Sequence, residues 1–129
     1  MSVHESVNDF SHEIIGAAVE VQRVLGTGLV ESAYATALEV ELAEREIGFQ
    51  RDVQLLAHYK RRDLGEVYRA GFVIEQSVIV ELRAVEVLTD LHRAQVMAAL
   101  RLSGLKLGLL INFNVFPVVK GVHRIVSKP

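Results

Sequence analysis

The range of possible folds is narrowed first by an almost uninterrupted apolar run, residues 107–113, bounded by Gly104 and Pro117. A strand that is apolar on both faces has to be buried on both faces, as in sheets covered by helices on each side. A second run, residues 78–85, is rich in β-branched residues and predicts another strand. The chain is therefore expected to contain a sheet that lies between layers of helices.

The segments around these runs show helical or alternating patterns. Apolar residues at three- and four-residue spacing predict helices over residues 7–25, 29–46 and 90–103. A Gly26–Gly28 turn is expected to end the first helix, Gly48 to end the second in the left-handed conformation, and Gly104 to end the third. Alternating segments predict a hairpin of strands 53–57 and 66–74 with a turn at 60–65, and a short edge strand at 122–126. The order predicts one α/β domain over residues 1–129, a mixed β-sheet flanked by helices in an α/β/α sandwich.

The composition agrees with one compact domain. A length of 129 residues fits a single core, and a hydrophobic fraction of 50% is high for so short a chain. Part of this apolar surface is therefore expected between subunits. The 14 Lys and Arg residues against 16 Asp and Glu residues give a net charge of −2, whereas proteins that hold nucleic acid non-specifically usually have a basic excess. The net charge does not support nucleic-acid binding, which leaves only a local basic patch for it.

Residue types exclude several other classes. The chain has no cysteine, so disulfides, thiolate metal sites and cysteine nucleophiles are excluded, and a cytoplasmic location is expected. No basic segment leads into an apolar one at the start of the sequence, and Lys106 and Asn112 keep the most apolar stretch short of a membrane span. Neither export nor membrane insertion is expected.

Glu81 and Arg83 are the first candidates for chemistry. Residues two apart on a strand point the same way, so a carboxylate lies beside a cation. In a metal-dependent phosphodiester hydrolase, the carboxylate would hold Mg²⁺ and the cation would stabilise charge on the phosphate. Most such pairs on strands are solvated charge pairs, so the pair alone does not establish a site.

Gly28, Glu31 and Tyr34 form a second candidate pattern at the start of a predicted helix. With Gly28 at the cap, Glu31 would be the third helical residue, where a carboxylate meets free backbone N–H groups and the positive end of the helix dipole. From the residues alone, helix capping is the favoured interpretation.

Together these residues match a known signature. Gly28, Glu31 and Tyr34 have the spacing after which the GxxExxY family is named, and the resemblance extends over almost the whole chain. It includes residues 14–21, 59–60, 68–70, 78–82, 105–114 and 121–126, together with His92 and Gln95. The chain resembles this family, which is placed in the PD-(D/E)xK nuclease-like superfamily with its restriction-endonuclease-like α/β/α sandwich.

The resemblance implies a site with an aspartate on one strand, a Glu-x-Lys on the next, and a glutamate and a glutamine on helices nearby. Glu31, Glu81 and Gln95 match this pattern. Gly71 stands where the family has the aspartate, and Arg83 stands where it has the lysine. Three further positions depart from the family pattern: Gln22 in place of a histidine, Asp52 in place of a glutamine, and Ala98-Ala99 in place of Asn-Tyr.

The replacements at Gly71 and Arg83 predict a degenerate catalytic site. Gly71 offers no carboxylate, so a hard cation would be held only by Glu81, water and Glu31. Arginine stays protonated in proteins, so Arg83 cannot act as a general base, although it can still stabilise a phosphate. We therefore expect a catalytically degenerate nuclease-like protein, without a cofactor, that acts as a binding or self-assembling homo-oligomeric scaffold module.

The alternative is an active nuclease that uses Mg²⁺ or Mn²⁺ to hydrolyse nucleic-acid phosphodiesters. It would use Glu31, Glu81 and Gln95, with Arg83 on the phosphate and Asp52 as a compensating metal ligand. The strand register around Asp52 decides whether it can reach the site, and that register cannot be read from one sequence. A ligand supplied by a neighbouring subunit would also repair the site.

Residues 115–119 are the first candidate for a subunit contact. Val115, Phe116, Pro117, Val118 and Val119 are unusually apolar for a segment that follows a buried strand, and proline resists regular strand pairing. A homo-oligomer built through this segment is the expected assembly.

Overall fold

The computed structural model describes residues 9–127, and its element order is the expected one. The helices are α1 (Ser11–Leu25), α2 (Glu31–Glu44) and α3 (Asp90–Ser103), with a short 3-10 helix, η1 (Val118–Gly121). The strands are β1 (Phe49–Tyr59), β2 (Arg62–Ile74), β3 (Val78–Arg83), β4 (Leu107–Asn112) and β5 (Val122–Val126). The part of the first predicted helix that precedes residue 9 lies outside the described residues.

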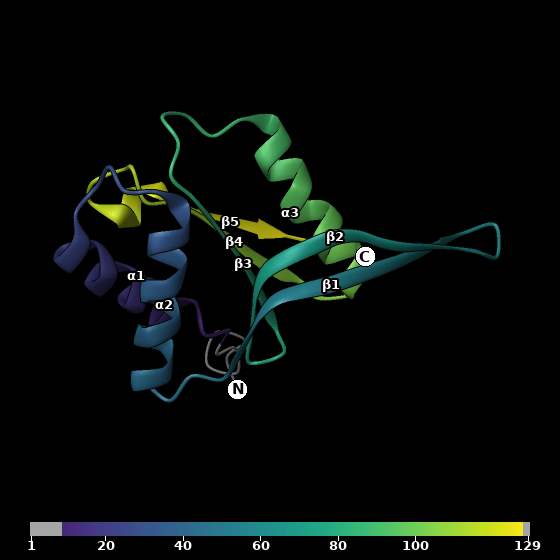
Figure 1. The fold of residues 1–129 in the computed structure, drawn as a ribbon, viewed down its shortest axis with the longest axis horizontal. Coiled ribbons are helices and arrows are strands. Elements are labelled where there is room, and N and C mark those ends of the chain that lie inside the picture. Colours follow the sequence, from purple (N-terminus) through teal and green to yellow (C-terminus); the bar gives the residue numbers. More distant parts are fainter. Residues whose placement is uncertain (1–8, 128–129) are drawn as a thin grey trace, which may run out of the picture.

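The five strands form one mixed sheet in the order β1-β2-β3-β4-β5 (Figure 1). Strands β3 and β4 are parallel, and the other neighbours are antiparallel. A parallel pair needs a crossover connection, and α3 supplies it between β3 and β4. The predicted mixed sheet is confirmed.

The two central strands are buried on both faces. On β3, Val78, Val80 and Leu82 pack into the cluster that contains α1 and α2, whereas Ile79 packs into the cluster that contains α3. The same alternation follows β4, where all six residues are buried. Helices α1 and α2 thus cover one face and α3 covers the other, which confirms the α/β/α sandwich (Figure 1). No helix among residues 9–127 is long and apolar enough to span a bilayer.

Both ends of α3 are capped, and the cap at its C-terminus is the predicted Gly104. The Thr89 hydroxyl accepts the N–H of His92, and the His92 ring accepts the N–H of Thr89 at 3.0 Å, which forms a reciprocal capping box. Gly104 ends the helix in the left-handed conformation with φ 76°. The family-matched His92 therefore has a structural role at the helix start.

The ends of α2 differ from the prediction. The helix has Val30 as its N-cap, so Glu31 is its first residue and not its third, and Gly28 lies before the cap. At the other end Glu46, with φ 59°, takes the left-handed position that was expected for Gly48. The reason is that the helix ends at Glu44, and the backbone bonds that close it run from Glu46 to Ala43 at 3.0 Å and from Ile47 to Leu42 at 2.9 Å, before Gly48 is reached.

The β1–β2 hairpin is longer than the sequence predicts. Its turn consists of Lys60 and Arg61 alone, with φ 48° and 69°, and not of residues 60–65. Two left-handed residues give the turn whose twist matches the flanking strands. Neither residue is a glycine or an asparagine, so the usual sequence signal for this tight turn is absent.

Halfway along the hairpin, the side chains that faced α1 and α2 give way to side chains that face α3 at the same strand spacing. Phe49 packs toward α1 and α2, but Val53 packs toward α3, although an even spacing would put both on one face. The same reversal occurs on β2 between Ala70 and Phe72. Asp52, with φ 53°, lies at this point of β1, and its conformation turns the outer half of the hairpin over onto α3.

Gln22 fixes the segment that follows β4. Its side chain is buried, its amide nitrogen donates to the carbonyls of Phe113 and Val115 at 3.0 and 2.7 Å, and its oxygen accepts the N–H of Val118 at 2.8 Å. Three backbone groups are thus satisfied by one side chain. Gln22, where the resemblance led us to expect a histidine, thus has a structural function in this chain.

Candidate functional site

Three of the predicted site residues meet on the α3 side of the sheet. Glu81 and Arg83 project from the end of β3, and Gln95 projects from α3. The Arg83 guanidinium donates to the Gln95 side-chain oxygen at 3.1 Å and lies 3.7 Å from the Glu81 carboxylate. Glu81 is only 4% exposed, so this is not a solvated surface pair.

Tyr68 and Gly71 of β2 complete the surroundings of Glu81. The Tyr68 hydroxyl donates to Glu81 Oε2 at 2.8 Å, and the N–H of Gly71 donates to both carboxylate oxygens at 3.2 and 3.3 Å. This N–H is free to do so because the ladder between β2 and β3 ends at the Phe72–Val80 pair. The sequence did not predict Tyr68 as a site residue. It lies three residues before Gly71, and residues an odd number apart on a regular strand point to opposite faces.

Gly71 is the position where the resemblance led us to expect an aspartate. A Cβ atom built at Gly71 would lie 2.9 Å from Glu81 Oε1 and 3.3 Å from the Val80 carbonyl oxygen. A side chain at this position would therefore point at Glu81. In this protein the Glu81 carboxylate itself fills the space that a second carboxylate would need.

Burial controls the ionisation of this cluster. Desolvation raises the pKa of Glu81, and the hydrogen bonds from Tyr68 and Gly71 and the charge of Arg83 only partly oppose it. The pKa of the Tyr68 hydroxyl is also raised, first by its own burial and then by the adjacent Glu81. The tyrosine therefore stays a proton donor to the carboxylate at neutral pH.

Replacing Glu81 with glutamine is expected to stabilise the fold at pH 8. A raised carboxyl pKa means that the folded state binds the proton more tightly than the unfolded chain, so stability falls as the pH rises above about 4.5, the ordinary value for glutamate. Glutamine can keep the oxygen that accepts from Tyr68 and avoids this penalty. We expect a gain of about 1 kcal/mol, or a few degrees in melting temperature.

Thermal unfolding at pH 8 and pH 4 measures this effect, and the gain should shrink at pH 4, where Glu81 is largely protonated. The exposed Glu86 provides the control, since Glu86→Gln should change neither melting temperature. A Glu81→Gln variant that is less stable at both pH values would mean that the ion pair with Arg83 outweighs the burial of the charge.

Glu31 lies at the edge of this cluster. It is the exposed first residue of α2, and its charge is one of those that raise the pKa of Glu81. The structure therefore brings the helical glutamate of the family pattern to the same end of the sheet as Glu81. Its position at the helix N-terminus also suits a carboxylate, as expected from the sequence.

Asp52 lies across from Gly71 in the strand register. Arg51 pairs with Phe72 and Val53 with Ala70, which puts Asp52 between the two pairs. Its side chain is 59% exposed and lies 3.9 Å from the Arg51 guanidinium. Its charge contributes to the raised pKa of Arg69, whereas the charges that act on Glu81 are those of Arg83 and Glu31.

The residues present do not fit a divalent metal ion. In the described part of the chain, no three carboxylate or histidine side chains are grouped closely enough to hold one. Both oxygens of Glu81 already accept hydrogen bonds, and the cation Arg83 lies beside them. Hard cations need several oxygen ligands, whereas this cluster offers the engaged carboxylate of Glu81 and only the exposed Glu31 at its edge.

Gly28 and Tyr34, two of the three residues of the Gly28, Glu31 and Tyr34 motif, have structural roles. Tyr34 is completely buried and stacks on Phe113 with ring centroids 4.6 Å apart. Its hydroxyl donates to the Gly26 carbonyl at 2.8 Å and accepts the N–H of Leu29 at 3.2 Å. Gly28, with φ 94°, allows the chain to turn between these two bonds. The tyrosine and the glycine of the motif thus fix the α1–α2 turn.

Only part of residues 115–119, the predicted subunit contact, is exposed. Val118 is buried in its own chain's core, because Gln22 holds its backbone there, and Val115 is half-buried. Phe116, Pro117 and Val119 remain exposed. A subunit contact through these three residues stays a prediction.

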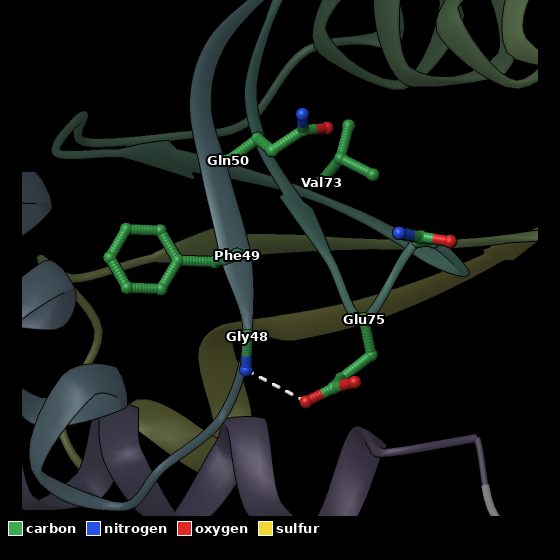
Figure 2. A pocket seen from close by; sticks show the side chains of 6 residues that line it. Gly48, Phe49, Gln50, Val73 and Glu75 are labelled. Atoms are coloured by element: carbon green, nitrogen blue, oxygen red, sulfur yellow. Dashed lines mark hydrogen bonds between the residues drawn. The ribbon is translucent and has the colours of Figure 1, made fainter.

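A hollow of about 370 Å³ lies elsewhere, where β1 begins and β2 ends (Figure 2). It is lined by Gly48, Phe49, Gln50, Val73, Glu75 and Gln76. Figure 2 shows the Glu75 carboxylate turned back to the N–H of Gly48, which closes one side of the hollow. None of its lining residues belongs to the Glu81 cluster.

No curated protein and no solved structure is similar enough to the chain to count as a match. A family model described as the PD-(D/E)XK nuclease superfamily matches residues 8–125, which include every residue of the Glu81 cluster. The chain therefore belongs to the PD-(D/E)XK nuclease superfamily.

Proposed function

We propose that this chain is a GxxExxY-type member of the superfamily whose hydrolytic site is degenerate, and that it acts as a binding or self-assembling module. The observation that carries the proposal is the geometry at Gly71. A Cβ there would lie 2.9 Å from Glu81 Oε1, and the backbone N–H of Gly71 holds the carboxylate in that space. The cluster is thus closed by internal hydrogen bonds in place of a metal ion.

Arg83 supports the same interpretation. Its guanidinium donates to the Leu82 carbonyl at 2.7 Å and to Gln95 at 3.1 Å, so the side chain is held by its own protein. It cannot accept a proton from water, as a lysine with a lowered pKa can. Arg83 therefore supplies neither a metal ligand nor a general base, and Gly71 supplies no second carboxylate beside Glu81.

A nuclease assay tests this function. Single- and double-stranded DNA and RNA are incubated with the protein and Mg²⁺ or Mn²⁺, beside Glu81→Ala and the double variant Gly71→Asp/Arg83→Lys. The natural protein is expected to cleave no substrate faster than Glu81→Ala does. Cleavage gained by the double variant would identify Gly71 and Arg83 as the lost parts, whereas natural activity that Glu81→Ala abolishes would refute the proposal.

The register of Asp52 favours one alternative, an active nuclease in which Asp52 replaces the missing ligand. This would require the exposed Asp52 side chain to leave Arg51 and turn toward Glu81. Calorimetric titration with Mn²⁺ distinguishes the two functions. Micromolar binding that is lost in both Asp52→Ala and Glu81→Ala would establish the alternative.

A further inference from the structure

The outer half of the β1–β2 hairpin forms an arm without cover of its own. We define the arm as residues 56–67, a segment in which no side chain is buried. It projects from one end of the molecule, beyond strands β3, β4 and β5 and helix α3 (Figure 1). Four large apolar side chains of the arm are 44–62% exposed: Leu56, Tyr59, Leu64 and Val67. A two-stranded ribbon is marginally stable alone in water, so these side chains favour a partner that covers the arm.

The tip of the arm carries positive charge. Within residues 9–127, none of Lys60, Arg61 and Arg62 forms an ion pair, and all three are exposed. The two acidic residues of the arm are engaged locally, Asp63 with the N–H of Gly65 and Glu66 with Arg69. The covering partner should therefore offer an apolar surface next to negative charge.

The other end of the same molecule has such a surface. A groove of about 280 Å³ runs between α1 and α2, lined by Glu20, Val21, Val24, Leu25, Ala37, Val40 and Glu41. Val24 and Val40 are 63% and 54% exposed on its rim. The helix η1 packs against α1, so the exposed Phe116 and Val119 extend the apolar surface at this end.

The C-terminal end of α2 adds negative charge beside the groove. Its last turn has no basic residue, and the C-cap residue Arg45 pairs with Glu41 of the groove at 2.8 Å, which leaves the carboxylates of Glu44 and Glu46 in excess. Glu44 and Glu46 are exposed, and neither forms an ion pair in the described part of the chain. Glu44 lies one turn beyond Val40, so the carboxylate and the exposed valine share one face of the helix.

We propose that the arm of one copy docks in the α1–α2 groove of a second copy, and that the two copies form a closed dimer. The arm and the helices α1 and α2, which line the groove, lie at opposite ends of the long axis (Figure 1), so a two-fold axis perpendicular to it places each arm at the helical end of the other copy. Arm and groove supply about twenty residues per copy, near the lower size of a standard interface. The proposal rests on the self-assembling part of the proposed function and specifies its surface.

Charge reversal combined with sedimentation tests the dimer. Arg61→Glu/Arg62→Glu reverses the charge at the tip of the arm. Glu44→Arg/Glu46→Arg reverses the charge at the end of α2, and a fourfold variant combines the two changes. Each double variant is expected to raise the dimer dissociation constant at least tenfold, and the fourfold variant to restore it because the charges again match. Arg93→Glu/Arg101→Glu, a reversal of two exposed residues on α3, is the matched control and should sediment as the natural protein does. Circular dichroism confirms that each variant is folded.

A natural protein that sediments as a monomer up to about 100 μM would overturn the proposal, as would a dimer that neither reversal weakens. Fluorescence anisotropy with a labelled DNA duplex tests whether nucleic acid, and not a second copy, covers the basic arm. Duplex binding that is lost in Arg61→Glu/Arg62→Glu, by a protein that stays monomeric, would assign the arm to nucleic acid. The sedimentation result does not depend on the result of the nuclease assay. The two experiments can therefore refute the dimer and the degenerate site separately.

Discussion

Gly71→Asp is expected to destabilise the metal-free protein by about 1–3 kcal/mol and to make it responsive to Mn²⁺. The new side chain would start 2.9 Å from Glu81 Oε1, and the nearest obstacle is the end of a flexible glutamate. Glu81 has to move, and two carboxylates so close together cannot both ionise without a cation between them. Burial already opposes ionisation of Glu81, which increases the cost.

Mn²⁺ should remove this cost, because the paired carboxylates then become ligands. Thermal unfolding in a chelator and in millimolar Mn²⁺ measures the effect. A metal concentration of 100 times the dissociation constant adds about 2.7 kcal/mol to the folded state. The natural protein should show no comparable shift.

Gly71→Asn is the matched control for this experiment, because it adds nearly the same volume without the charge. It should lose less stability in the chelator and gain little from Mn²⁺. If Gly71→Asp and Gly71→Asn responded equally to Mn²⁺, the position would not be a lost ligand position, and the explanation of the degenerate site would fail.

Tyr34→Ala is expected to lower the free energy of unfolding by about 3–5 kcal/mol. The substitution removes a completely buried ring that stacks on Phe113 at 4.6 Å, and it also removes the hydroxyl that joins Gly26 to Leu29. A domain of this kind has a total stability of about 5–15 kcal/mol, so the variant should be close to unfolding at 37 °C. Urea unfolding at 25 °C measures the loss.

Tyr34→Phe separates the two contributions. It keeps the stacked ring and removes only the hydroxyl, so a loss of about 1 kcal/mol is expected. A Tyr34→Ala variant as stable as Tyr34→Phe would show that the stacking on Phe113 contributes little. In that case the tyrosine of the motif would need an explanation other than the stability of the α1–α2 turn.

The Glu81 cluster shows how far a sequence can define a site. The spacing of Glu81 and Arg83 indicated a shared face, and the family pattern added Gln95 and Glu31, which the structure brings to the same end of the sheet. Tyr68 could not be found in this way. Alternation would direct Tyr68 and Gly71 to opposite faces, and only the reversal of the hairpin near Asp52 brings the tyrosine to Glu81.

The arm illustrates the same limit. The basic residues Lys60, Arg61 and Arg62 are visible in the sequence, but as a long solvated turn at residues 60–65. The tight turn at Lys60 and Arg61 lengthens both strands and carries the charges away from the core. No local signal for this turn exists, because it depends on two residues that rarely adopt positive φ.

The sandwich follows from the sequence alone, since strands that are apolar on both faces must be covered by helices on both sides. The sequence also shows that position 71 offers no carboxylate and that position 83 carries a fixed positive charge, because both are properties of residue type. What lies beside Gly71 depends instead on the tertiary structure, which places the Glu81 carboxylate there, held by Tyr68 and by the backbone of Gly71. Buried polar groups must find partners, and the partners within reach depend on where the β2–β3 ladder ends and where the hairpin turns over.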